Sequence, residues 1–202
     1  MIYSLKNKER VIFMKRLIFT PQALCMCALF TALIAVGAFI RIPLPVIPFT
    51  LQTLFIMLAG LLLGRRGAFI SCGVYFVLGM IGVPIFTQGG GFGYIFKPTF
   101  GYLIGFVIGA WLIGAIAYYR VQQPSYLRMF MASFAGLAVI YLLGTVYYYF
   151  LAVYYMGKTI AVWPLLVSCV FMTLPTDIVS ALAAAFLAKR ILPWIQRFKI
   201  QM

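Results

Sequence analysis

Residues 101–119 read GYLIGFVIGAWLIGAIAYY, a stretch without a single charged side chain. A helix needs about 20 predominantly apolar residues to cross the hydrocarbon layer of a membrane. Working outward from this stretch, similar apolar runs are found on both sides of it. They predict an all-α, polytopic membrane protein of six transmembrane helices, at residues 22–40, 50–64, 67–86, 101–119, 129–156 and 175–192.

The composition agrees with a membrane protein. Apolar residues make up 65% of the 202 residues and charged residues only 9%, whereas soluble domains average about 45–50% and about 25%. The chain therefore has too little polar surface to cover a soluble globule. A secretory signal peptide is a weaker interpretation of the first apolar run, which is longer than the apolar core of such a peptide. We expect a cytoplasmic basic tail at residues 1–16 and a single membrane domain at residues 17–202.

The basic residues orient the predicted bundle. Lys and Arg concentrate on the cytoplasmic side of membrane proteins, and six spans divide them 13 to 3, so we expect both termini in the cytoplasm. A complete seventh span through the apolar stretch 159–174 would change the division to 9 to 7. We therefore expect that stretch to be an interfacial or re-entrant segment. The cytoplasmic residues would be Lys6, Lys8, Arg10, Lys15, Arg16, Arg65, Arg66, Arg120, Arg128, Lys189, Arg190, Arg197 and Lys199, and the external ones Arg41, Lys97 and Lys158.

The titratable residues exclude most enzymes. The chain has no His, and its only acids are Glu9 and Asp177, so the sequence offers no paired carboxylates, histidine base or metal-ligand cluster. Gly157-Lys158-Thr159 resembles the end of a phosphate-binding loop, but Ala152 stands where that motif needs a glycine. We expect no catalytic residue, cofactor, metal or ATPase in this chain, and the net charge of +14 comes in small clusters that favour a membrane over nucleic acid. We interpret the cysteines as small packing residues: Cys25, Cys27, Cys72 and Cys169.

Polar and conformationally special residues gather on the expected external side. The segment Arg41-Ile-Pro-Leu-Pro-Val-Ile-Pro-Phe-Thr50 carries three prolines and should be an irregular loop. Residues 87–102 combine glycines, which let a backbone approach a ligand, with aromatic side chains; a flexible loop without function is the alternative. Asp177 is the only acid inside an apolar run, where charges are costly and usually functional, although it could simply cap a helix that begins near Pro175.

Small residues at four-residue spacing mark places where helices can approach closely in a membrane. They are Ala28 and Ala32, Gly60 and Gly64, and the series Gly101, Gly105 and Gly109. Packing inside the bundle is the preferred interpretation for any one of these sets.

Together these segments resemble the BioY family, the biotin-specific substrate-capture (S) components of energy-coupling factor (ECF) transporters. The resemblance rests on Arg41-Ile-Pro-Leu-Pro with Pro48-Phe-Thr-Leu-Gln52, on residues 89–102 and on Pro175-Thr-Asp177, which stand in the family's order. It implies a six-helix protein of the cell membrane that binds biotin from outside. Uptake would need a transmembrane coupling subunit, contacted through Ala28 and Ala32, and two ABC-type ATPases.

The resemblance also implies roles in binding. Arg41 would hold the carboxylate of biotin, and Asp177 would accept hydrogen bonds from its ureido N–H groups. Relatives typically carry a lysine where this chain has Ser180, and Lys97 or Lys158 could take its place. The substrate-binding residues expected in this way are Arg41, Gln88, Gly91, Tyr94, Lys97, Tyr102, Asp177 and Ser180.

Three other functions are compatible with these residues. The chain could be an S component for another vitamin, because the family's lysine is missing, or a self-sufficient proton-coupled carrier that uses Asp177. A membrane-embedded enzyme is a third possibility, but it would lack a visible base, metal set or activated nucleophile. Biotin suits an aromatic pocket with few polar groups, because it combines an apolar bicycle with a hydrogen-bonding ureido edge and one anionic tail.

Overall fold

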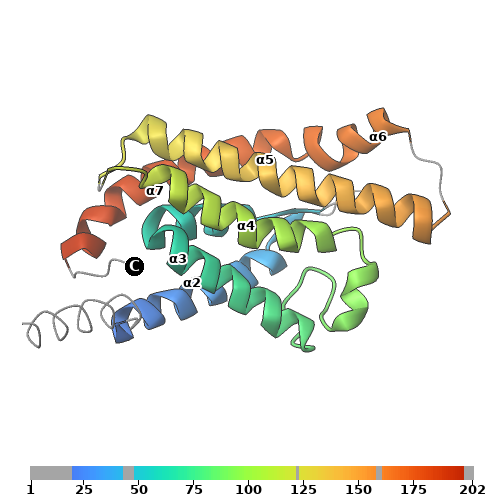
Figure 1. Ribbon diagram of the computed structural model, residues 1–202, viewed down its shortest axis with the longest axis horizontal. Helices are drawn as coiled ribbons and strands as arrows, with labels where there is room; N and C mark the ends of the chain where they lie inside the picture. Colours follow the sequence, from blue (N-terminus) through green and yellow to red (C-terminus); the bar gives the residue numbers. More distant parts are fainter. Residues whose placement is uncertain (1–19, 43–47, 122, 158–160, 198–202) are drawn as a thin grey trace, which may run out of the picture.

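The computed structural model describes residues 20–42, 48–121, 123–157 and 161–197. These residues are mostly helical, with a short antiparallel pairing of β1 and β2 and several turns (Figure 1). The elements in chain order are α2 (Pro21–Phe39), β1 (Arg41–Ile42), β2 (Phe49–Thr50), α3 (Gln52–Met80), the 3₁₀ helix η1 (Phe92–Phe96), α4 (Phe100–Ala117), α5 (Tyr126–Phe150), the π-helical turn η2 (Leu151–Tyr155), α6 (Val162–Leu166), the π-helical turn η3 (Val167–Phe171) and α7 (Leu174–Arg197).

Five helical stretches among the described residues are long and apolar enough to cross a membrane, which confirms the all-α, multi-pass class. Local sequence signals set where two of them begin. The Thr20 hydroxyl accepts the backbone N–H of Ala23 at the start of α2, and the Ser125 hydroxyl accepts that of Arg128 at the start of α5. The five stretches are Pro21–Phe39, Gln52–Met80, Phe100–Ala117, Tyr126–Tyr155 and Trp163–Ile195.

Helix α3 is folded back on itself at Gly64. This residue has a φ of 69° and a ψ of −176°, which interrupts the helix and is readily adopted only by glycine. The Gln52 side-chain amide donates to the Tyr75 hydroxyl at 2.8 Å, although 23 residues of straight helix would separate the two by about 34 Å. The two halves of α3 therefore lie side by side, and they correspond to the two spans expected on either side of Gly64.

The segment before α7 differs from the expectation. Residues 158–160 lie outside the described part of the chain, but from Trp163 the chain continues through α6, η3 and α7 as one helical run. The re-entrant alternative is therefore wrong for residues 161–174, whereas the interfacial alternative stays a prediction. Pro175 accounts for the wide turns before α7, because proline has no N–H and its ring crowds the preceding turn. The bond from Met172 N–H to the Val167 carbonyl, at 3.1 Å, spans five residues instead of four.

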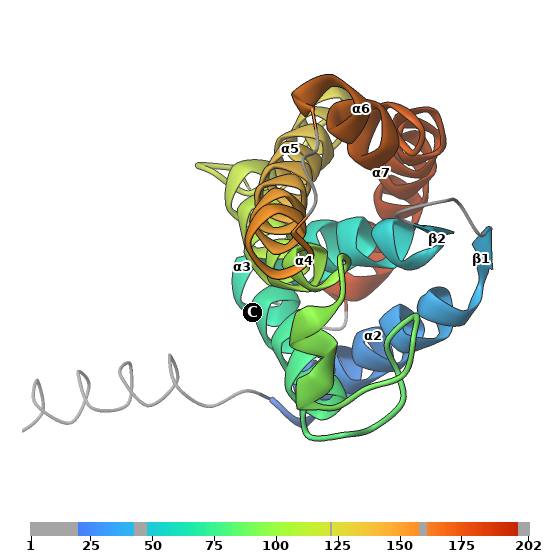
Figure 2. The same ribbon diagram turned by 90° about the vertical axis from the view of Figure 1, so that its right-hand side faces the viewer.

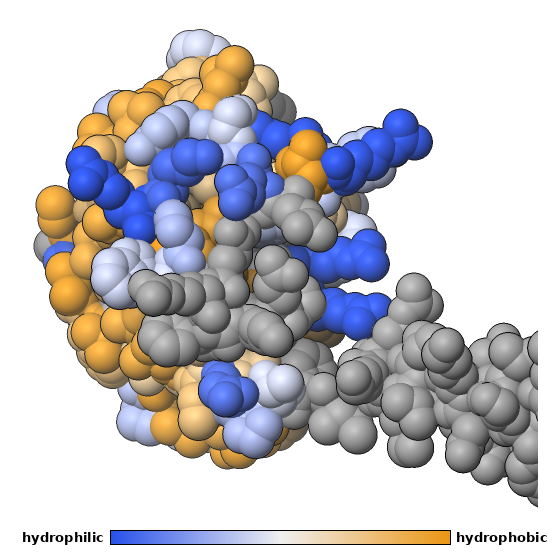
Figure 3. Space-filling view, turned by 90° about the vertical axis from the view of Figure 1, so that its left-hand side faces the viewer, coloured by the Kyte–Doolittle hydropathy of each residue, from blue (hydrophilic) through white to orange (hydrophobic). Residues whose placement is uncertain are grey.

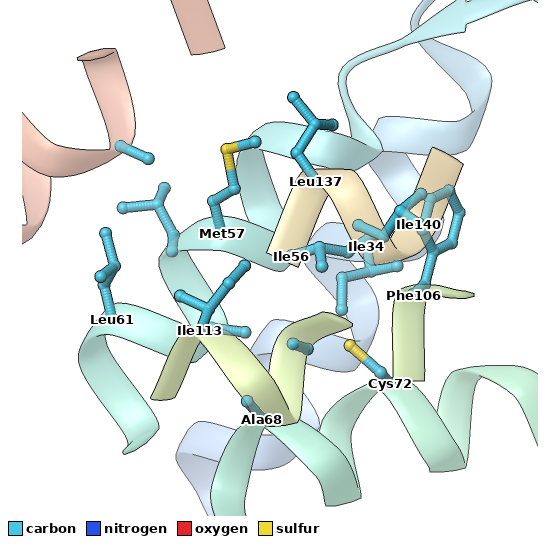
Figure 4. Packing of buried hydrophobic residues seen from close by; sticks show 14 of the residues in the cluster. Ile34, Ile56, Met57, Leu61, Ala68, Cys72, Phe106, Ile113, Leu137 and Ile140 are labelled. Carbon is cyan, nitrogen blue, oxygen red and sulfur yellow. The ribbon is translucent and has the colours of Figure 1, made fainter. Parts of the chain in front are cut away.

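The core lies where α2, α3, α4 and α5 meet (Figure 4). Ile34, Ile56, Ile113 and Ile140 come from these four helices in turn, and each is at most 2% exposed. Glycines of α4 allow the close approach of α5: a Cβ on Gly105 or Gly109 would lie within 3 Å of Ile140. Packing inside the bundle is thus the correct interpretation of the glycine series in this helix.

The small residues of α2 face the other way. Ala28 and Ala32 are exposed, whereas Cys27 and Phe30 on the opposite side of the helix are buried. The preferred interpretation of internal packing is therefore wrong for this alanine pair. Cys25 is exposed as well, so the interpretation as a buried packing residue holds for the remaining cysteines, Cys27, Cys72 and Cys169.

The two ends of the bundle differ in their elements and their polarity. Helices α2 and α5 begin, α3 folds back, and α4 and α7 end at the left of Figure 1, where hydrophilic side chains gather (Figure 3). The opposite end, which faces the viewer in Figure 2, carries β1, β2 and η1, with Arg41 and Lys97 nearby. The described basic residues are divided between the ends as the sequence predicts, with the first end holding Arg65, Arg66, Arg120, Arg128, Lys189 and Arg190.

Gly114 of α4 allows a test of the packing around the bend in α3. A Cβ at this position would lie 2.3 Å from the Arg65 backbone nitrogen and 2.5 Å from the Gly64 carbonyl carbon. Overpacking of this kind costs about 1–3 kcal/mol, and each kcal/mol lowers the unfolding temperature of a chain this size by about 2–4 °C. Gly114→Ala should therefore lower the thermal unfolding temperature of the purified protein by several degrees.

Gly73→Ala is the matched control for that measurement. Gly73 lies in the second half of α3, and a Cβ there would meet nothing within 4 Å. Alanine is favoured over glycine inside a helix by about 0.5–1 kcal/mol, so the control should unfold at an unchanged or higher temperature. Equal losses in both variants would contradict the close contact at the bend.

Candidate functional site

A pocket opens at the end of the bundle that carries β2 and η1. It contains about 540 Å³ of empty space when its mouth is included. Its wall combines apolar and aromatic side chains with an amide, a carboxylate and the hydroxyls of five threonines and three tyrosines, a mixture that suits a small-molecule site. The described residues that line it are Pro48, Phe49, Thr50, Gln52, Thr53, Thr87, Tyr94, Thr99, Tyr102, Leu103, Phe106, Leu137, Ile140, Tyr141, Thr173 and Asp177.

Asp177 places a carboxylate in this lining and is only 4% exposed. The Tyr141 hydroxyl of α5 donates to its Oδ2 at 2.5 Å and lies 3.0 Å from Thr173 Oγ1. The other carboxylate oxygen, Oδ1, is buried and has no hydrogen-bond partner among the described residues. Because a buried acceptor without a partner costs free energy, this oxygen is suited to accept a donor from a bound molecule.

The contacts of α7 do not support the alternative that Asp177 is only a helix cap. Helix α7 begins at Leu174, and Pro175 fits its first turn because no N–H donor is needed there. A capping carboxylate would accept a backbone N–H of that turn, yet the hydrogen-bond partner of Asp177 is Tyr141, on another helix. The side chain thus links α7 to α5 at the wall of the pocket.

A second polar region of the pocket consists of three hydroxyl groups. Thr87 Oγ1 lies 2.8 Å from Tyr94 Oη, which lies 2.9 Å from Thr99 Oγ1. The glycine-rich loop brings Tyr94 into place, because Gly91, at a φ of 92°, donates its N–H to the Gly79 carbonyl at 2.7 Å. The loop is therefore folded against α3 and lines the pocket, which argues against a flexible loop without function.

The apolar part of the pocket is shared with the core. Phe106, Leu137 and Ile140 line the pocket and also belong to the buried cluster of the bundle (Figure 4). The site therefore rests on tightly packed helices, which hold its shape better than loops would. Tyr102 lines the pocket too, but its hydroxyl donates to the Cys169 carbonyl at 2.9 Å, so it offers its ring and not a free proton.

The structure brings three of the eight expected binding residues together in the pocket lining, namely Tyr94, Tyr102 and Asp177. Ser180 is buried one turn after Asp177 and donates its hydroxyl to the Thr176 carbonyl at 3.0 Å, outside the lining. Lys158, which the sequence offers as a substitute for the family's lysine, lies outside the described residues.

The remaining four expected residues lie outside the lining. The Arg41 guanidinium donates to the carbonyl of Thr87, so it stands beside a lining residue. Lys97 is exposed directly after η1, and its backbone N–H donates to the carbonyl of Tyr94 at 2.9 Å. Gln88 is exposed and Gly91 half-buried in the glycine-rich loop.

The predictions from the sequence did not include several polar residues that line the pocket. Gln52 is 2% exposed and ends a motif that the resemblance used, and Thr53 follows it at the start of an apolar span. Thr173 lies two residues before Pro175, and these positions could have been inferred as polar groups at the mouths of predicted spans. Tyr141 carries no such signal, because tyrosines are frequent in its helix and only the fold shows which of them reaches α7.

Comparison with known families settles the kinship of the chain. Residues 10–197 match the model of the BioY family. The chain belongs to the BioY family. One similar relative is the probable biotin transporter BioY of Lysinibacillus sphaericus, 51% identical over 127 residues, which are 63% of this chain and 64% of that protein. The probable biotin transporter BioY of Pyrococcus horikoshii is 35% identical over 82% of this chain and 93% of its own length.

A solved structure has the same fold as this BioY-family chain. It is the crystal structure of an S-component for biotin from an ECF-type ABC transporter, with a TM-score of 0.70 and 25% sequence identity. The match covers 84% of this chain and 90% of the other. The chain is thus a multi-pass membrane protein with the fold of a transport S component, which agrees with the resemblance noted in its motifs.

Asp177 also offers a test that needs no ligand. A buried carboxylate with one unpartnered oxygen costs stability, whereas an asparagine of the same shape removes the charge and can still accept from Tyr141. Asp177→Asn should therefore raise the thermal unfolding temperature of the ligand-free BioY-family protein. A lower unfolding temperature would instead assign Asp177 a structural role.

Proposed function

We propose that this chain captures biotin from outside the cell and is the S component of an ATP-driven ECF transporter in the cell membrane. The observation that carries the proposal is the buried, unpartnered Oδ1 of Asp177 in a pocket that combines apolar and aromatic side chains with hydroxyls. The ureido ring of biotin presents N–H donors, and its fused rings present apolar surface. The names of the curated relatives and of the similar solved structure support biotin as the substrate class. The chain is a transport subunit and not an enzyme.

The proposal assigns roles to the lining residues. Asp177 accepts hydrogen bonds from the ureido N–H groups, and Tyr102 packs its ring against the apolar bicycle. Arg41, on the rim beside Thr87, attracts the carboxylate of biotin. Of the remaining expected residues, Gln88, Gly91 and Lys97 surround the mouth, whereas Ser180, whose hydroxyl donates to the Thr176 carbonyl, has no contact with the ligand.

The proposal also includes partner subunits, because the chain carries no ATPase motif of its own. They are a transmembrane coupling subunit and two ABC-type ATPases. The exposed pair Ala28 and Ala32 on α2 supports a contact with the coupling subunit, since small residues let a second helix come close in a membrane.

We further propose that the chain crosses the membrane six times with both termini in the cytoplasm. The reversal of α3 at Gly64 supports two crossings within that element. The concentration of described basic residues at the end where α2 begins and α7 ends supports the orientation (Figure 3).

Removal of the Asp177 carboxylate should weaken biotin binding to the purified protein. A hydrogen bond to a charged group contributes roughly 1.5–3 kcal/mol, so Asp177→Ala should raise the dissociation constant about 10- to 150-fold. Asp177→Asn keeps one acceptor and should lose less. Ser180→Ala, one turn further along and outside the pocket lining, is the control and should bind like the wild type. Wild-type affinity in a folded Asp177→Ala protein would remove Asp177 from the binding site.

A bulky residue on the exposed side of α2 should separate binding from uptake. Ala32→Trp should impair cellular biotin uptake while the isolated protein binds biotin normally, because the tryptophan blocks the approach of the coupling subunit. Ala138→Trp places the same change on the exposed face of α5 and should leave both activities intact. Loss of binding in Ala32→Trp would place Ala32 in the core. Uptake by the chain without partner subunits would favour a self-sufficient carrier.

Cysteine labelling should report the proposed orientation. In a cysteine-free background, Gly93→Cys should react with a membrane-impermeant reagent added to intact cells, because residue 93 is exposed at the pocket end. Val121→Cys, exposed after α4, and Tyr3→Cys should react only after the cells are opened. External labelling at residue 3 or 121 would contradict cytoplasmic termini.

A further inference from the structure

A groove on the outer side of the bundle lies between the second half of α3 and α4. It contains about 690 Å³ of empty space when its open side is included, and it is lined by Arg66, Phe69, Ile70, Ile108 and Trp111. Three of its apolar side chains, those of Phe69, Ile108 and Trp111, are exposed. The groove shares no residue with the lining of the ligand pocket, so it is a separate feature that opens to the surroundings of the bundle.

Two close contacts between α3 and α4 bound this groove. At the basic end, a Cβ on Gly114 would lie 2.3 Å from a backbone nitrogen at the bend of α3. Towards the pocket end, the ring centroids of Phe76 and Phe100 lie 5.9 Å apart. Between the two contacts, a Cβ on Gly73 would meet nothing within 4 Å, so this side of α3 stays open. From Arg66 to Gly73 the helix rises about 10 Å, which is about two thirds of the hydrocarbon depth of one leaflet.

The groove faces the membrane on a different side from the proposed contact with the coupling subunit. Helix α2 packs on α3 through Thr31, which donates to the Ser71 carbonyl at 3.0 Å. With 3.6 residues per turn, Phe69 and Gly73 lie almost half a turn around the helix from Ser71. The body of α3 therefore separates the groove from the exposed alanines of α2. An open apolar groove on a membrane-facing surface is filled by acyl chains, because they form the solvent there.

The charges at the basic end of the groove distinguish between lipids. Arg66 lines the groove and is exposed, as is its neighbour Arg65, at the end where hydrophilic side chains gather (Figure 3). The chain has 16 basic residues and two acids, so most of its cations must be balanced by anions from outside. Acyl chains are common to all phospholipids and give no preference. A guanidinium, in contrast, attracts an anionic headgroup and binds its phosphate through paired N–H donors.

Trp111 supplies a second polar group near that end. Tryptophan favours the membrane–water interface, where its ring packs among apolar groups and its N–H finds an acceptor. None of the described residues accepts a hydrogen bond from the indole N–H of Trp111, although the ring lines the groove. The ester and phosphate oxygens of a phospholipid are acceptors at this depth, so a lipid in the groove can satisfy this donor.

We propose that the groove binds one anionic phospholipid of the cytoplasmic leaflet. Its headgroup lies at Arg66, and one acyl chain runs along Phe69, Ile108 and Trp111. The apolar side chains hold the acyl chain, and Arg66 provides the selection for negative charge. The choice of leaflet follows from the proposed orientation, whereas the site itself is independent of the substrate that the chain carries.

The test measures the fluorescence of Trp111 in the full chain reconstituted into phosphatidylcholine bilayers. Trp163 and Trp194, the other two of three tryptophans, are exposed and are replaced by phenylalanine in this parent protein. Phospholipids with brominated acyl chains quench a tryptophan that they contact. Brominated phosphatidylglycerol, which is anionic, should occupy the groove about five-fold more strongly than brominated phosphatidylcholine, because one arginine near a membrane surface contributes roughly that factor.

Three variants of the parent protein separate the charge at the groove from charge elsewhere. Arg66→Gln should remove most of the preference while brominated phosphatidylcholine quenches as before, which shows that the groove is intact. Arg66→Lys keeps the charge and should keep most of the preference. Arg190→Gln removes an exposed arginine of α7 at the same end of the bundle, so it is the matched control and should leave the preference unchanged.

Three results would overturn the lipid site. The first is equal quenching by the two lipids in the parent protein, and the second is a full preference in Arg66→Gln or an equal loss in Arg190→Gln, which would assign the preference to the net charge of that end. The third is an absence of quenching by either lipid, which would mean that protein, such as a second copy of this chain, covers the groove. None of these results depends on whether the chain binds biotin.

Discussion

The reversal of α3 at Gly64 determines where the walls of the pocket lie. The first half of the helix begins with Gln52, and the second half ends just before the glycine-rich loop that carries Tyr94. The bond between the Gln52 amide and the Tyr75 hydroxyl closes this hairpin, and Tyr75 in turn donates to the Ile85 carbonyl at 3.0 Å. Because Ile85 has only an acceptor to offer, the tyrosine proton must go there and the amide N–H must point to the tyrosine. The start of one half, the end of the other and the loop are thereby fixed to one another.

The two ends of the bundle use their polar groups differently. At the basic end, side chains donate to backbone carbonyls of neighbouring segments: Arg128 donates to Ile116 at 3.1 Å, and Lys189 donates to Pro124 at 2.9 Å. These bonds tie α5 and α7 to the end of α4 and its following loop. At the pocket end, Asp177 keeps one oxygen without a partner. This oxygen is an acceptor to which a bound ligand can donate.

The features that the sequence predicts well are those that follow from composition and periodicity. Long apolar runs are sufficient for the helices, and prolines and glycines are sufficient for the irregular mouth. A lone acid in an apolar run indicates Asp177, because burial of a charge without purpose is costly. The continuous path from α6 into α7 was not predictable in this way. Pro164 and Pro175 indicate a break in the helix, but in the structure a π-helical turn between them lets the helical run continue.

Which residues line the pocket depends on helix packing that the sequence alone does not predict. Tyr141 and Tyr147 lie on the same helix, yet Tyr141 donates to Asp177 and Tyr147 to the Ile95 carbonyl. Which tyrosine serves the site depends on how α5 is rotated against its neighbours, and the glycines of α4 set that rotation through contacts with Ile140. Residue type alone does not contain this information, because it is a property of two helices together.

The contact between α2 and α3 connects the exposed face of α2 with the pocket. Thr31 donates to the Ser71 carbonyl at 3.0 Å in the middle of this contact. Near its pocket end, a Cβ on Gly37 would lie 2.9 Å from the backbone nitrogen of Gln52, which lines the pocket. Ala28 and Ala32 are exposed on the outer side of the same helix. Because nothing larger than glycine fits between α2 and Gln52, a displacement of α2 relative to α3 must change the position of this pocket wall or break the contact. A subunit that pressed on the exposed face would therefore act on the pocket through a single helix.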